Sequence, residues 1–563
     1  MAHFTENNRL EDIFLKGWYP YAWLIALGVL LYFKTLFFDF TYLDDKALIL
    51  DNKTFISDLS NIPAVFQQRI FPHLKAPYYR PVLILSFMLN AQLNGTSLFG
   101  YHLFNILLHA LASCLVFLFL SNLEYRKISA LFVSMLFAVH PLLAEAVAWV
   151  PGRNDLLLTI FAISSMIFFI RYLRSGKSVF YLWHIIFFGL ALFTKETAVF
   201  LIIAYILFAD LIEKQKIFAF DKVSLFTGWL FIAAFWFLLR WSALIDTWET
   251  TLYGMCASLL VSLPAVIQFI GKIVMPFNLS VFPTMRDTTF VYGLISAAAV
   301  VTGLAVSKSK RNSFVIFGFA WFMFFLLPSL VRPDMRYVHD FQEHRLYMPI
   351  VGFGIMLLEI DFIKKLRLSI RKDFIFPVAV LLTFSVINFV HCDNFRNRLS
   401  FWANACLTSP NSKVVRMNMG LAYAASGFPK EAERELKKAI SLSPAVGGIY
   451  FRLGNFYLDE NMLDKAEGAL KKELVLDPLN YSAHLSLGVV YYKQGRFGKA
   501  VEEWERTLWL KRDNIEARKN LAIYYREKKD FEKSLYYIKQ LQKMNVEIPR
   551  EFLDALKARD SFG

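Results

Sequence analysis

Two adjacent carboxylates, Asp44 and Asp45, follow directly after the first long apolar stretch of the chain. A charged side chain in or near hydrocarbon costs roughly 2.5 to 3.5 kcal/mol on insertion scales, so packing does not explain the pair. A carboxylate held in such a place can act as a general base that takes a proton from a hydroxyl group. Solvated acids in a turn would also fit these two residues, and only their surroundings separate the two interpretations.

Further charged or titratable side chains of both signs stand at the ends of later apolar stretches. They are Arg80, His140, Glu145, Arg153, Lys195, Glu196 and Arg345. Arginine binds a phosphate group with its planar fork, and lysine binds it as a point charge. Carboxylates beside such cations indicate a polar cavity at one membrane face, in which a base acts next to a phosphate.

Each of these residues also has a structural interpretation when it is taken singly. His140 could close a helix end, and Glu145 could pair with Arg153 to hold a hairpin. Lys195 could extend its ammonium group to the membrane interface. Arg345 could be an ordinary interfacial anchor. Their occurrence together is what indicates chemistry.

The composition places these residues in a membrane protein. Of 563 residues, 56% are hydrophobic, 17% are aromatic and only 19% are charged, which is too apolar for an ordinary soluble chain. The net charge of +15 lies largely in short loops, where it sets orientation, so nucleic acid is not a predicted partner. The four cysteines show no CxxC spacing and indicate neither zinc nor disulfides. The first apolar run lacks a small-residue cleavage site and is predicted to be a retained span.

Apolar windows predict about eleven membrane spans. They cover residues 18–38, 101–120, 129–150, 156–170, 179–193, 198–212, 223–241, 291–306, 313–330, 346–360 and 374–390. Two further apolar stretches are predicted to be interfacial or re-entrant. The stretch 81–93 is too short to cross, and the stretch 252–275 is interrupted by Pro264 and Lys272.

The loops between the spans predict the orientation. Basic residues gather at 126–127, 171–177, 214–222, 308–311 and 364–372, which lie on one side if every predicted span crosses once. By the positive-inside rule this side is cytoplasmic. The Asp44-Asp45 pair and the chain after about residue 391 then face the opposite compartment.

The C-terminal part is built from repeats. Glycines at 420, 454 and 488, tyrosines at 423, 457, 491 and 525, and alanines at 432, 466 and 500 each recur at a step of 34 residues. This period is typical of tetratricopeptide repeats, which stack paired helices into a solenoid. We predict an all-α protein with a multispan domain at 1–391, a junction with a partial repeat at 392–412, and about four repeats at 413–563.

The order of the motifs resembles a known family. The motifs are Asp44-Asp45, Tyr79-Arg80-Pro81, the run 101–109, His140-Pro141 with Glu145, the run 152–156, Lys195-Glu196 and the run 344–349. Together with the repeats, they resemble the transmembrane O-mannosyltransferases that carry tetratricopeptide repeats. The membrane part is similar to the wider GT-C class of glycosyltransferases, which use lipid-phosphate sugars.

The resemblance implies a glycosyltransferase with a polyprenyl- or dolichyl-phosphate sugar as donor and with the acid pair as catalytic residues. We expect Asp44, rather than Asp45, to be the base, and the sugar to be mannose or another hexose. The predicted donor-phosphate ligands are Arg345, Lys195 and Arg80, in that order, and the predicted orienting residues are Glu145, Arg153, Glu196 and His140. Magnesium or manganese would suit the carboxylates, but two acids do not specify a metal site and none is assigned.

The chain departs from the family at two motifs. The third-loop run reads Pro151-Gly152-Arg153-Asn154, and His344 stands where the family often has glutamate, with Glu343 one place earlier. Donor and acceptor are therefore open to differ from those of the eukaryotic members. Short loops favour a bacterial chain in the inner membrane. A eukaryotic chain would lie in the endoplasmic reticulum membrane, and in both cases the repeats are expected on the extracytoplasmic side.

Three functions remain to be compared. The first is sugar transfer to a hydroxyl of an exported protein or a glycan, with the solenoid binding a protein partner. The second is a non-enzymatic membrane scaffold, which has no need of charges at so many helix ends. The third is a transporter or lipid flippase, which would place charges deep within spans and would show duplicated halves. The charges at one membrane face favour the first function.

Overall fold

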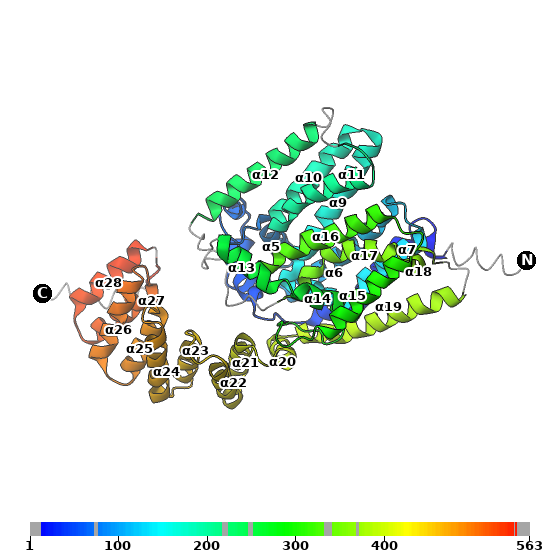
Figure 1. Ribbon diagram of the computed structural model, residues 1–563. Helices are drawn as coiled ribbons and strands as arrows, with labels where there is room; N and C mark the ends of the chain where they lie inside the picture. The colour runs from blue at the N-terminus through cyan, green and yellow to red at the C-terminus, as the bar shows by residue number, and fades with distance from the viewer. Residues whose placement is uncertain are drawn as a thin grey trace, which may run out of the picture. The chain divides into compact units, whose positions relative to one another are not determined.

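The computed structural model describes residues 13–71, 77–216, 223–245, 252–331, 341–366, 371–544 and 546–548. These residues fold into helices joined by turns, and none of the described residues lies in a β-strand. The chain divides into two compact units, Met1–Ser409 and Pro410–Gly563, whose helices are labelled in Figure 1. The predicted fold class, an apolar helix bundle followed by paired helices, is confirmed.

The first unit contains the predicted apolar helices. They are α2 (Tyr19–Tyr32), α3 (Lys53–Ser57), α4 (Ile62–Val65), α5 (Pro81–Asn94), α6 (Leu98–Asn122), α7 (Lys127–Val139), α8 (Ala144–Ala148), α9 (Arg153–Ser175), α10 (Ser178–Thr194), α11 (Leu201–Leu211), α12 (Val223–Ala243), α13 (Leu252–Ser262), α14 (Ala265–Val274), α15 (Val291–Val306), α16 (Asn312–Leu330), α17 (Pro349–Leu358), α18 (Asp361–Lys364), α19 (Arg371–Cys392) and α20 (Arg398–Thr408).

Six helices among the described residues are long and apolar enough to cross a membrane. They cover Tyr19–Phe37, Leu98–Asn122, Val150–Ser175, Val223–Ala243, Asn312–Leu330 and Ile375–Phe395. Two bent pairs bring the number to eight if each pair is one span, namely Lys127–Val139 with Pro141–Ala148 and Tyr253–Ser262 with Ala265–Val274. The interruption predicted at Pro264 is present as a bend of 42° between α13 and α14.

The number of long helices is lower than the roughly eleven predicted spans because several predicted spans are short helices. The helices at 179–193, 291–306 and 346–360 have 17, 16 and 10 residues. Since an α-helix rises about 1.5 Å per residue, they fall short of the roughly 30 Å of a hydrocarbon core. The apolar windows at 179–193 and 291–306 were as short as their helices, and only the window at 346–360 is longer than the helix it contains.

Helices α16 and α17 pack backbone against backbone. A Cβ atom added to Gly318 would lie 2.7 Å from the carbonyl oxygen of Gly352, and one added to Gly352 would lie 2.5 Å from the carbonyl oxygen of Gly318. Both positions therefore require glycine, because the obstructing atoms belong to the main chain. Beside this contact, the indole Nε1 of Trp321 donates a hydrogen bond of 3.1 Å to the carbonyl oxygen of Met348. The two helices are held in a fixed register.

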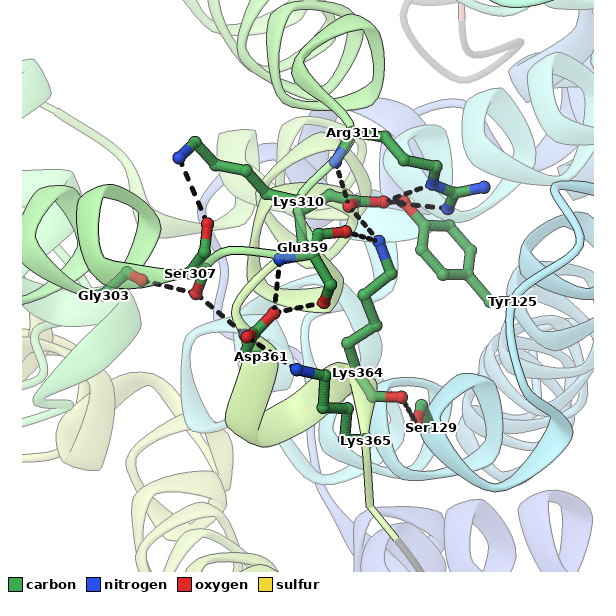
Figure 2. Close-up of polar contacts among 11 residues, drawn as sticks. Tyr125, Ser129, Gly303, Ser307, Lys310, Arg311, Glu359, Asp361, Lys364 and Lys365 are labelled. Carbon is green, nitrogen blue, oxygen red and sulfur yellow. Dashed lines mark hydrogen bonds and ion pairs between the residues drawn. The ribbon is translucent and has the colours of Figure 1, made fainter.

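A buried carboxylate joins three loops at one end of the first unit. Figure 2 shows Glu359, which is fully buried, with Tyr125, Arg311 and Lys364 directed at its carboxylate. One oxygen accepts from the Tyr125 hydroxyl at 2.8 Å and from Arg311 Nε at 2.9 Å. The other accepts from the Arg311 backbone N–H at 2.7 Å and from Lys364 Nζ at 2.6 Å. We call these four residues the Glu359 cluster.

The second unit consists of helix pairs at the predicted period. Its helices are α21 (Lys413–Ala425), α22 (Pro429–Leu442), α23 (Ile449–Asp459), α24 (Leu463–Leu476), α25 (Tyr481–Lys493), α26 (Phe497–Leu510), α27 (Ile515–Glu527) and α28 (Phe531–Lys543). Gly420 and Gly488 lie where the second helix of a pair comes closest. A Cβ there would lie 2.7 Å from Leu436 Cγ or 2.5 Å from Trp504 Nε1, which explains the recurring glycine.

The recurring tyrosine connects one repeat to the next. The Tyr457 hydroxyl donates to Glu433 of the preceding repeat at 2.8 Å, and the Tyr491 hydroxyl donates to Glu467 of its preceding repeat at 3.4 Å. Glycine and tyrosine therefore recur for different physical reasons, one within a repeat and the other between repeats. Contacts of this kind between neighbours are what stabilise a solenoid.

Candidate functional site

The Asp44-Asp45 pair lies at the start of the short helical turn η2 (Lys46–Leu50), in the loop between α2 and α3. Asp45 is only 1% exposed, and its Oδ2 accepts hydrogen bonds from the Thr41 backbone N–H at 3.0 Å and from the Thr41 hydroxyl at 2.5 Å. Its Oδ1 has no hydrogen-bond partner among the described residues. Asp44 is half-buried, and no described residue hydrogen-bonds to its carboxylate. The two acids are thus different: Thr41 binds one, and the other is free to react.

The surroundings raise the pKa of both acids towards 7. Burial raises the pKa of Asp44 to about 6, against the opposing charge of Arg80. Burial raises the pKa of Asp45 to about 7, the hydrogen bond from Thr41 acts against it, and the charge of Asp44 adds to it. A carboxyl group with a pKa near the working pH is well suited to general-base catalysis.

Arg80 links the acid pair to the later loops. It precedes α5, and its Nη2 donates to Glu196 Oε1 at 3.2 Å, while its guanidinium lies over the Tyr78 ring at 4.7 Å from the ring centre. With the Asn154 amide oriented to satisfy its neighbours, the amide oxygen accepts from Arg80 Nη1 at 3.2 Å. The positive charge also reaches Asp44 and lowers its pKa. Arg80 is therefore a centre on which groups from three loops converge.

Lys195 and Glu196 lie beside Arg80 but form separate pairs. Lys195 Nζ contacts Asp155 Oδ1 at 2.7 Å, and both side chains are buried. Burial lowers the pKa of Lys195, against the raising effect of Asp155. Burial raises the pKa of Glu196, but the charge of Arg80, the hydrogen bonds from its own backbone N–H and from Arg80, and the charge of Lys195 together outweigh burial and bring the pKa to about 2. We call Asp44, Arg80, Asp155, Lys195 and Glu196 the Arg80 cluster.

Glu145 and the late motif form the next part of the site. Glu145, in the first turn of α8, accepts a hydrogen bond from the His344 backbone N–H at 3.0 Å, and its other carboxylate oxygen lies 2.8 Å from His344 Nδ1. The guanidinium of Arg345 donates to the Ser329 carbonyl oxygen. Both His344 and Arg345 belong to the short turn η9 (Glu343–Leu346). Glu145 thus fixes η9 next to the loop between α8 and α9.

Trp149 lies between the two parts. Its ring centre is 5.5 Å from that of His344, and its indole N–H is close enough to Asp45 to lower the pKa of that carboxyl. The acid pair, the Arg80 cluster and η9 are consequently neighbours, although their residues span positions 44 to 345 of the sequence. This is the convergence that the sequence predicted.

Arg153 departs from the prediction. All three of its guanidinium nitrogens are used within the helix bundle: Nε donates to Asn105 Oδ1 at 2.8 Å, Nη1 to the Ser86 carbonyl at 3.2 Å and Nη2 to the Tyr101 carbonyl at 3.0 Å. It is fully buried and lies over the Phe87 ring. Arg153 therefore joins α9 to α5 and α6, and it neither pairs with Glu145 nor orients the acids.

His140 also has a structural place. Its Nε2 is hydrogen-bonded to the Ile273 carbonyl at 2.9 Å, and its Nδ1 accepts from the Leu142 backbone N–H at 3.3 Å. Both ring nitrogens are therefore used to close the turn after α7 and to hold α14. The alternative of a satisfied helix-end histidine is the correct one, and the orienting role predicted for His140 does not fit.

Several residues of the site are not predicted by the sequence. Asp155 stands two places after Arg153 in the quoted motif, and it is the residue that meets Lys195. Lys272, noted only as an interruption, forms a buried ion pair with Glu343. A lysine inside an apolar stretch was the available signal, since such a charge needs a partner. Thr41 carried no signal at all.

Magnesium or manganese would suit the two carboxylates, and the structure was compared with that requirement over the described residues. No group of three or more histidine, cysteine, aspartate or glutamate side chains there could hold a metal ion. The two acids of the first loop do not add a third such ligand. The site's described chemistry consists of carboxylates, guanidinium groups, an ammonium group and an imidazole.

Comparisons with known proteins match both parts of the chain. The family of dolichyl-phosphate-mannose-protein mannosyltransferases matches residues 77–241, and tetratricopeptide repeats match 417–481 and 463–509. The matched membrane segment includes Arg80, Asp155, Lys195 and Glu196, whereas Asp44 lies before it. The predicted resemblance to mannosyltransferases with tetratricopeptide repeats is confirmed.

Individual relatives are named protein O-mannosyl-transferases. F38B6.6 of Caenorhabditis elegans is 24% identical over 443 residues, which are 75% of this chain and 62% of the relative. Human TMTC3 is 34% identical over 157 residues, 27% of this chain and 16% of the relative. Drosophila melanogaster Tmtc1 is 34% identical over 178 residues, 31% of this chain and 21% of the relative. The chain therefore spans less than two thirds of the length of these relatives.

Proposed function

We propose that the chain is a membrane glycosyltransferase that moves a hexose such as mannose from a polyprenyl- or dolichyl-phosphate sugar to an acceptor hydroxyl. One observation carries the proposal: Asp44 is a half-buried carboxylate to which no described residue hydrogen-bonds, and it lies close enough to Arg80 for the arginine's charge to lower its pKa, which burial raises to about 6. A base beside a cation is what transfer from a sugar phosphate needs. The match of residues 77–241 to mannosyltransferases supports the same chemistry.

In the proposed reaction, the Asp44 carboxylate takes the proton of the acceptor hydroxyl while the hydroxyl oxygen attacks the anomeric carbon. The bond from this carbon to the phosphate oxygen breaks, and the lipid phosphate leaves with the bonding electrons. Asp44 is favoured over Asp45 as the base because two hydrogen bonds from Thr41 occupy Asp45 Oδ2. Thr41 and Asp45 hold the loop that presents Asp44.

The contacts change the order of the cations that would stabilise the leaving phosphate. Arg80 comes first because it is near Asp44. The charge of Lys195 is balanced by Asp155, and Arg345 donates to the Ser329 carbonyl, so both are second to Arg80. Fixed cations at the point where negative charge develops lower the barrier without reorganisation.

We further propose that the reaction takes place at the extracytoplasmic face. The predicted basic loops meet at one end of the unit, which supports their common side. Ser129, after the first of these loops, donates to the Ile363 carbonyl at 2.8 Å, and Arg311 and Lys364 share Glu359. Arg174 donates to the Asn122 carbonyl at 3.0 Å. By the positive-inside rule this end is cytoplasmic, in a bacterial inner membrane or in the endoplasmic reticulum membrane.

The acceptor proposed is a serine or threonine hydroxyl of an exported protein, with a glycan as the other candidate. The repeats of the second unit support a protein acceptor because such solenoids bind peptides or protein surfaces. A scaffold without activity would use the same repeats, but it would not require the acids of the first loop. The two hypotheses therefore differ in whether Asp44 is required: the transferase needs it, and the scaffold does not.

The experiment is sugar transfer from a lipid-linked donor in membranes that contain the full chain. Asp44→Asn should reduce the rate by about 10² to 10⁴, as expected for loss of a general base. Asp51→Asn is the matched control, because Asp51 is an exposed acid of the same loop and is expected to leave the rate unchanged. An unchanged rate in Asp44→Asn would overturn the proposed function at this site.

A further inference from the structure

A buried ion pair connects the late motif to α14. Lys272, in the last turn of α14, contacts the carboxylate of Glu343, the first residue of η9, and their side chains are 5% and 1% exposed. Glu343 Oε1 also accepts from the Ser280 backbone N–H at 3.0 Å, and Lys272 Nζ donates to the Asn278 carbonyl oxygen at 3.2 Å. The pair therefore joins η9 both to α14 and to the loop that follows α14.

The loop after α14 is held in turn by α20, the last helix of the first unit. The Ser280 hydroxyl lies 2.6 Å from the Thr408 hydroxyl, and the Val281 backbone N–H donates to Asn404 Oδ1 at 3.0 Å. Ser280 thus contacts Glu343 of η9 through its backbone and α20 through its side chain. A short series of hydrogen bonds therefore runs from α20 to η9.

Stability alone does not require charges at this position. Two ions lose hydration free energy when they are buried, and apolar residues of similar volume in their place often leave a protein equally or more stable. What the charges add is direction, because the Glu343 carboxylate accepts from an ammonium group and from a backbone N–H, and both contacts fix where η9 lies. The next two residues are His344 and Arg345, which belong to the candidate site.

We infer that Lys272 and Glu343 are positioning residues of the transfer site, which fix η9 so that His344 meets Glu145. They act through His344 and Arg345, and through Ser280 they also connect η9 to α20. The inference rests on the proposed function, because it concerns the same site. A misplacement of about 1 Å can lower a rate about 10²-fold, so the hold on η9 bears directly on the rate of transfer.

The experiment removes both charges of the pair together. Lys272→Met combined with Glu343→Leu keeps the approximate volume of the two side chains and leaves neither ion buried without a partner. For the full chain in lipid nanodiscs, we expect this double variant to have an unfolding temperature at least equal to that of the wild type. The kcat of sugar transfer should fall about ten- to hundredfold, because η9 is no longer fixed. The KM of the lipid-linked donor should change little.

Hydrogen exchange gives a second readout that needs no activity. The His344 backbone N–H donates to Glu145 at 3.0 Å and should exchange slowly in the wild type. In the double variant this amide should exchange about tenfold faster, although the unfolding temperature does not fall. Either a wild-type kcat or a wild-type exchange rate in the folded double variant would overturn the inference. So would a lower unfolding temperature with faster exchange throughout the unit, since this would make the pair a purely structural contact.

A graded variant and a matched control sharpen the test. Glu343→Gln combined with Lys272→Met keeps an oxygen that can accept from the Ser280 N–H, so part of the lost kcat should return. The control is Arg174→Met combined with Glu213→Leu, which removes an ion pair of 2.9 Å at the far end of α9, about 30 Å along this helix from the site. The control should keep the wild-type kcat, and an equal loss of kcat in both double variants would overturn the inference.

Thr408→Val tests the connection to α20. It removes the hydroxyl that meets Ser280 and keeps the size of the side chain, so kcat should fall about fivefold, the usual effect of losing one neutral hydrogen bond. Leu407→Ala is its control, because Leu407 is 82% exposed on the same helix, and it should transfer sugar at the wild-type rate. A wild-type kcat in Thr408→Val would overturn the connection to α20.

Failure of the inference can be told apart from failure of the proposed function. Transfer that is lost in Asp44→Asn but kept at the wild-type rate in Lys272→Met with Glu343→Leu would support the function and overturn the positioning role. A wild-type chain without transfer activity would overturn the function. The exchange rate of the His344 amide would then still decide whether the ion pair fixes η9.

Discussion

The Glu359 cluster and the Arg80 cluster are built from the same kinds of side chain, but they differ in how completely their carboxylate oxygens are paired. Both oxygens of Glu359 are occupied, by two donors each. In the Arg80 cluster, Glu196 Oε2 is buried without a hydrogen-bond partner among the described residues, while each cluster leaves one guanidinium nitrogen without a hydrogen bond, Arg80 Nε and Arg311 Nη2. Buried polar groups are normally satisfied, so those that are not call for a reason. A closed network holds helices together, and an open one leaves capacity for a ligand.

The sharpest test of this comparison is to remove one carboxylate charge from the closed network. Glu359→Gln leaves Arg311 and Lys364 near a neutral group, and breaking a buried pair in this way typically costs about 3 to 5 kcal/mol. We expect a clear fall in the unfolding temperature in detergent or nanodiscs. Asp44→Asn is the contrast, since it should lower the transfer rate and leave the unfolding temperature at least as high. Equal destabilisation by both would remove the distinction between the clusters.

Removing the charge of Asp45 should stabilise the protein, whereas Glu359→Gln should destabilise it. The pKa of Asp45 is raised in the folded state to about 7, so its charged form is disfavoured there. The contribution of protonated Asp45 to the free energy of unfolding is complete below the pKa that the group has in the unfolded state. It is lost as the pH rises through the pKa of the group in the folded state. At pH 8, Asp45→Asn should therefore stabilise the protein by on the order of 2 kcal/mol, while its amide oxygen can still accept from Thr41.

The advantage of Asp45→Asn over the wild type should disappear when unfolding is measured near pH 4, where the carboxyl group is protonated in the folded state. A stabilisation that is the same at pH 4 and pH 8 would show that titration is not its cause. Loss of stability at both values would place Asp45 with Glu359 among the residues of a closed network.

The pH dependence of transfer should follow Asp44. With a pKa of about 6, its basic form is lost as the pH falls, and the rate at pH 5 should be about one tenth of the rate at pH 8. The measurement is a pH profile of initial rates with saturating donor, and Asp51→Asn should give the same profile as the wild type. A flat profile between pH 5 and 8 would argue against a carboxylate base in this environment.

The smallest effect is expected at the exposed rim of the closed network. Lys365 contacts Asp361 at 2.7 Å across one helical turn, and the lysine is largely in solvent. Exposed pairs of this kind often contribute nothing measurable. Lys365→Gln should leave both the unfolding temperature and the transfer rate unchanged. A marked loss of stability would mean that the network extends further than its buried centre.

The sequence predicts which loops hold the site, and it does not predict which side chain of each loop points inward. Arg153 and Asp155 illustrate this, because residues two apart on a helix face different directions. Arg153 turns to Asn105 in the bundle, whereas Asp155 turns to Lys195.

More of the fold than of the site could be predicted from the sequence. Packing requirements recur along the chain at a regular spacing, whereas the residues of the site do not. Each repeat requires a small residue, such as Gly420 or Gly488, where its two helices come closest. The solenoid can therefore be predicted from the 34-residue period of the sequence. The number of spans was less accessible, since helix ends depend on turns and contacts rather than on apolar length. The 10-residue helix α17 lies within a predicted span of 15 residues at 346–360.

The facing glycines of α16 and α17 limit how the membrane unit can change in evolution. At Gly318 and Gly352 the obstructing atom is a main-chain oxygen of the other helix, so no change of side chain at the partner position can make room for alanine. A second substitution in the facing helix therefore cannot relieve the clash that a larger residue at Gly318 or Gly352 would cause. We expect both glycines to accept no single replacement.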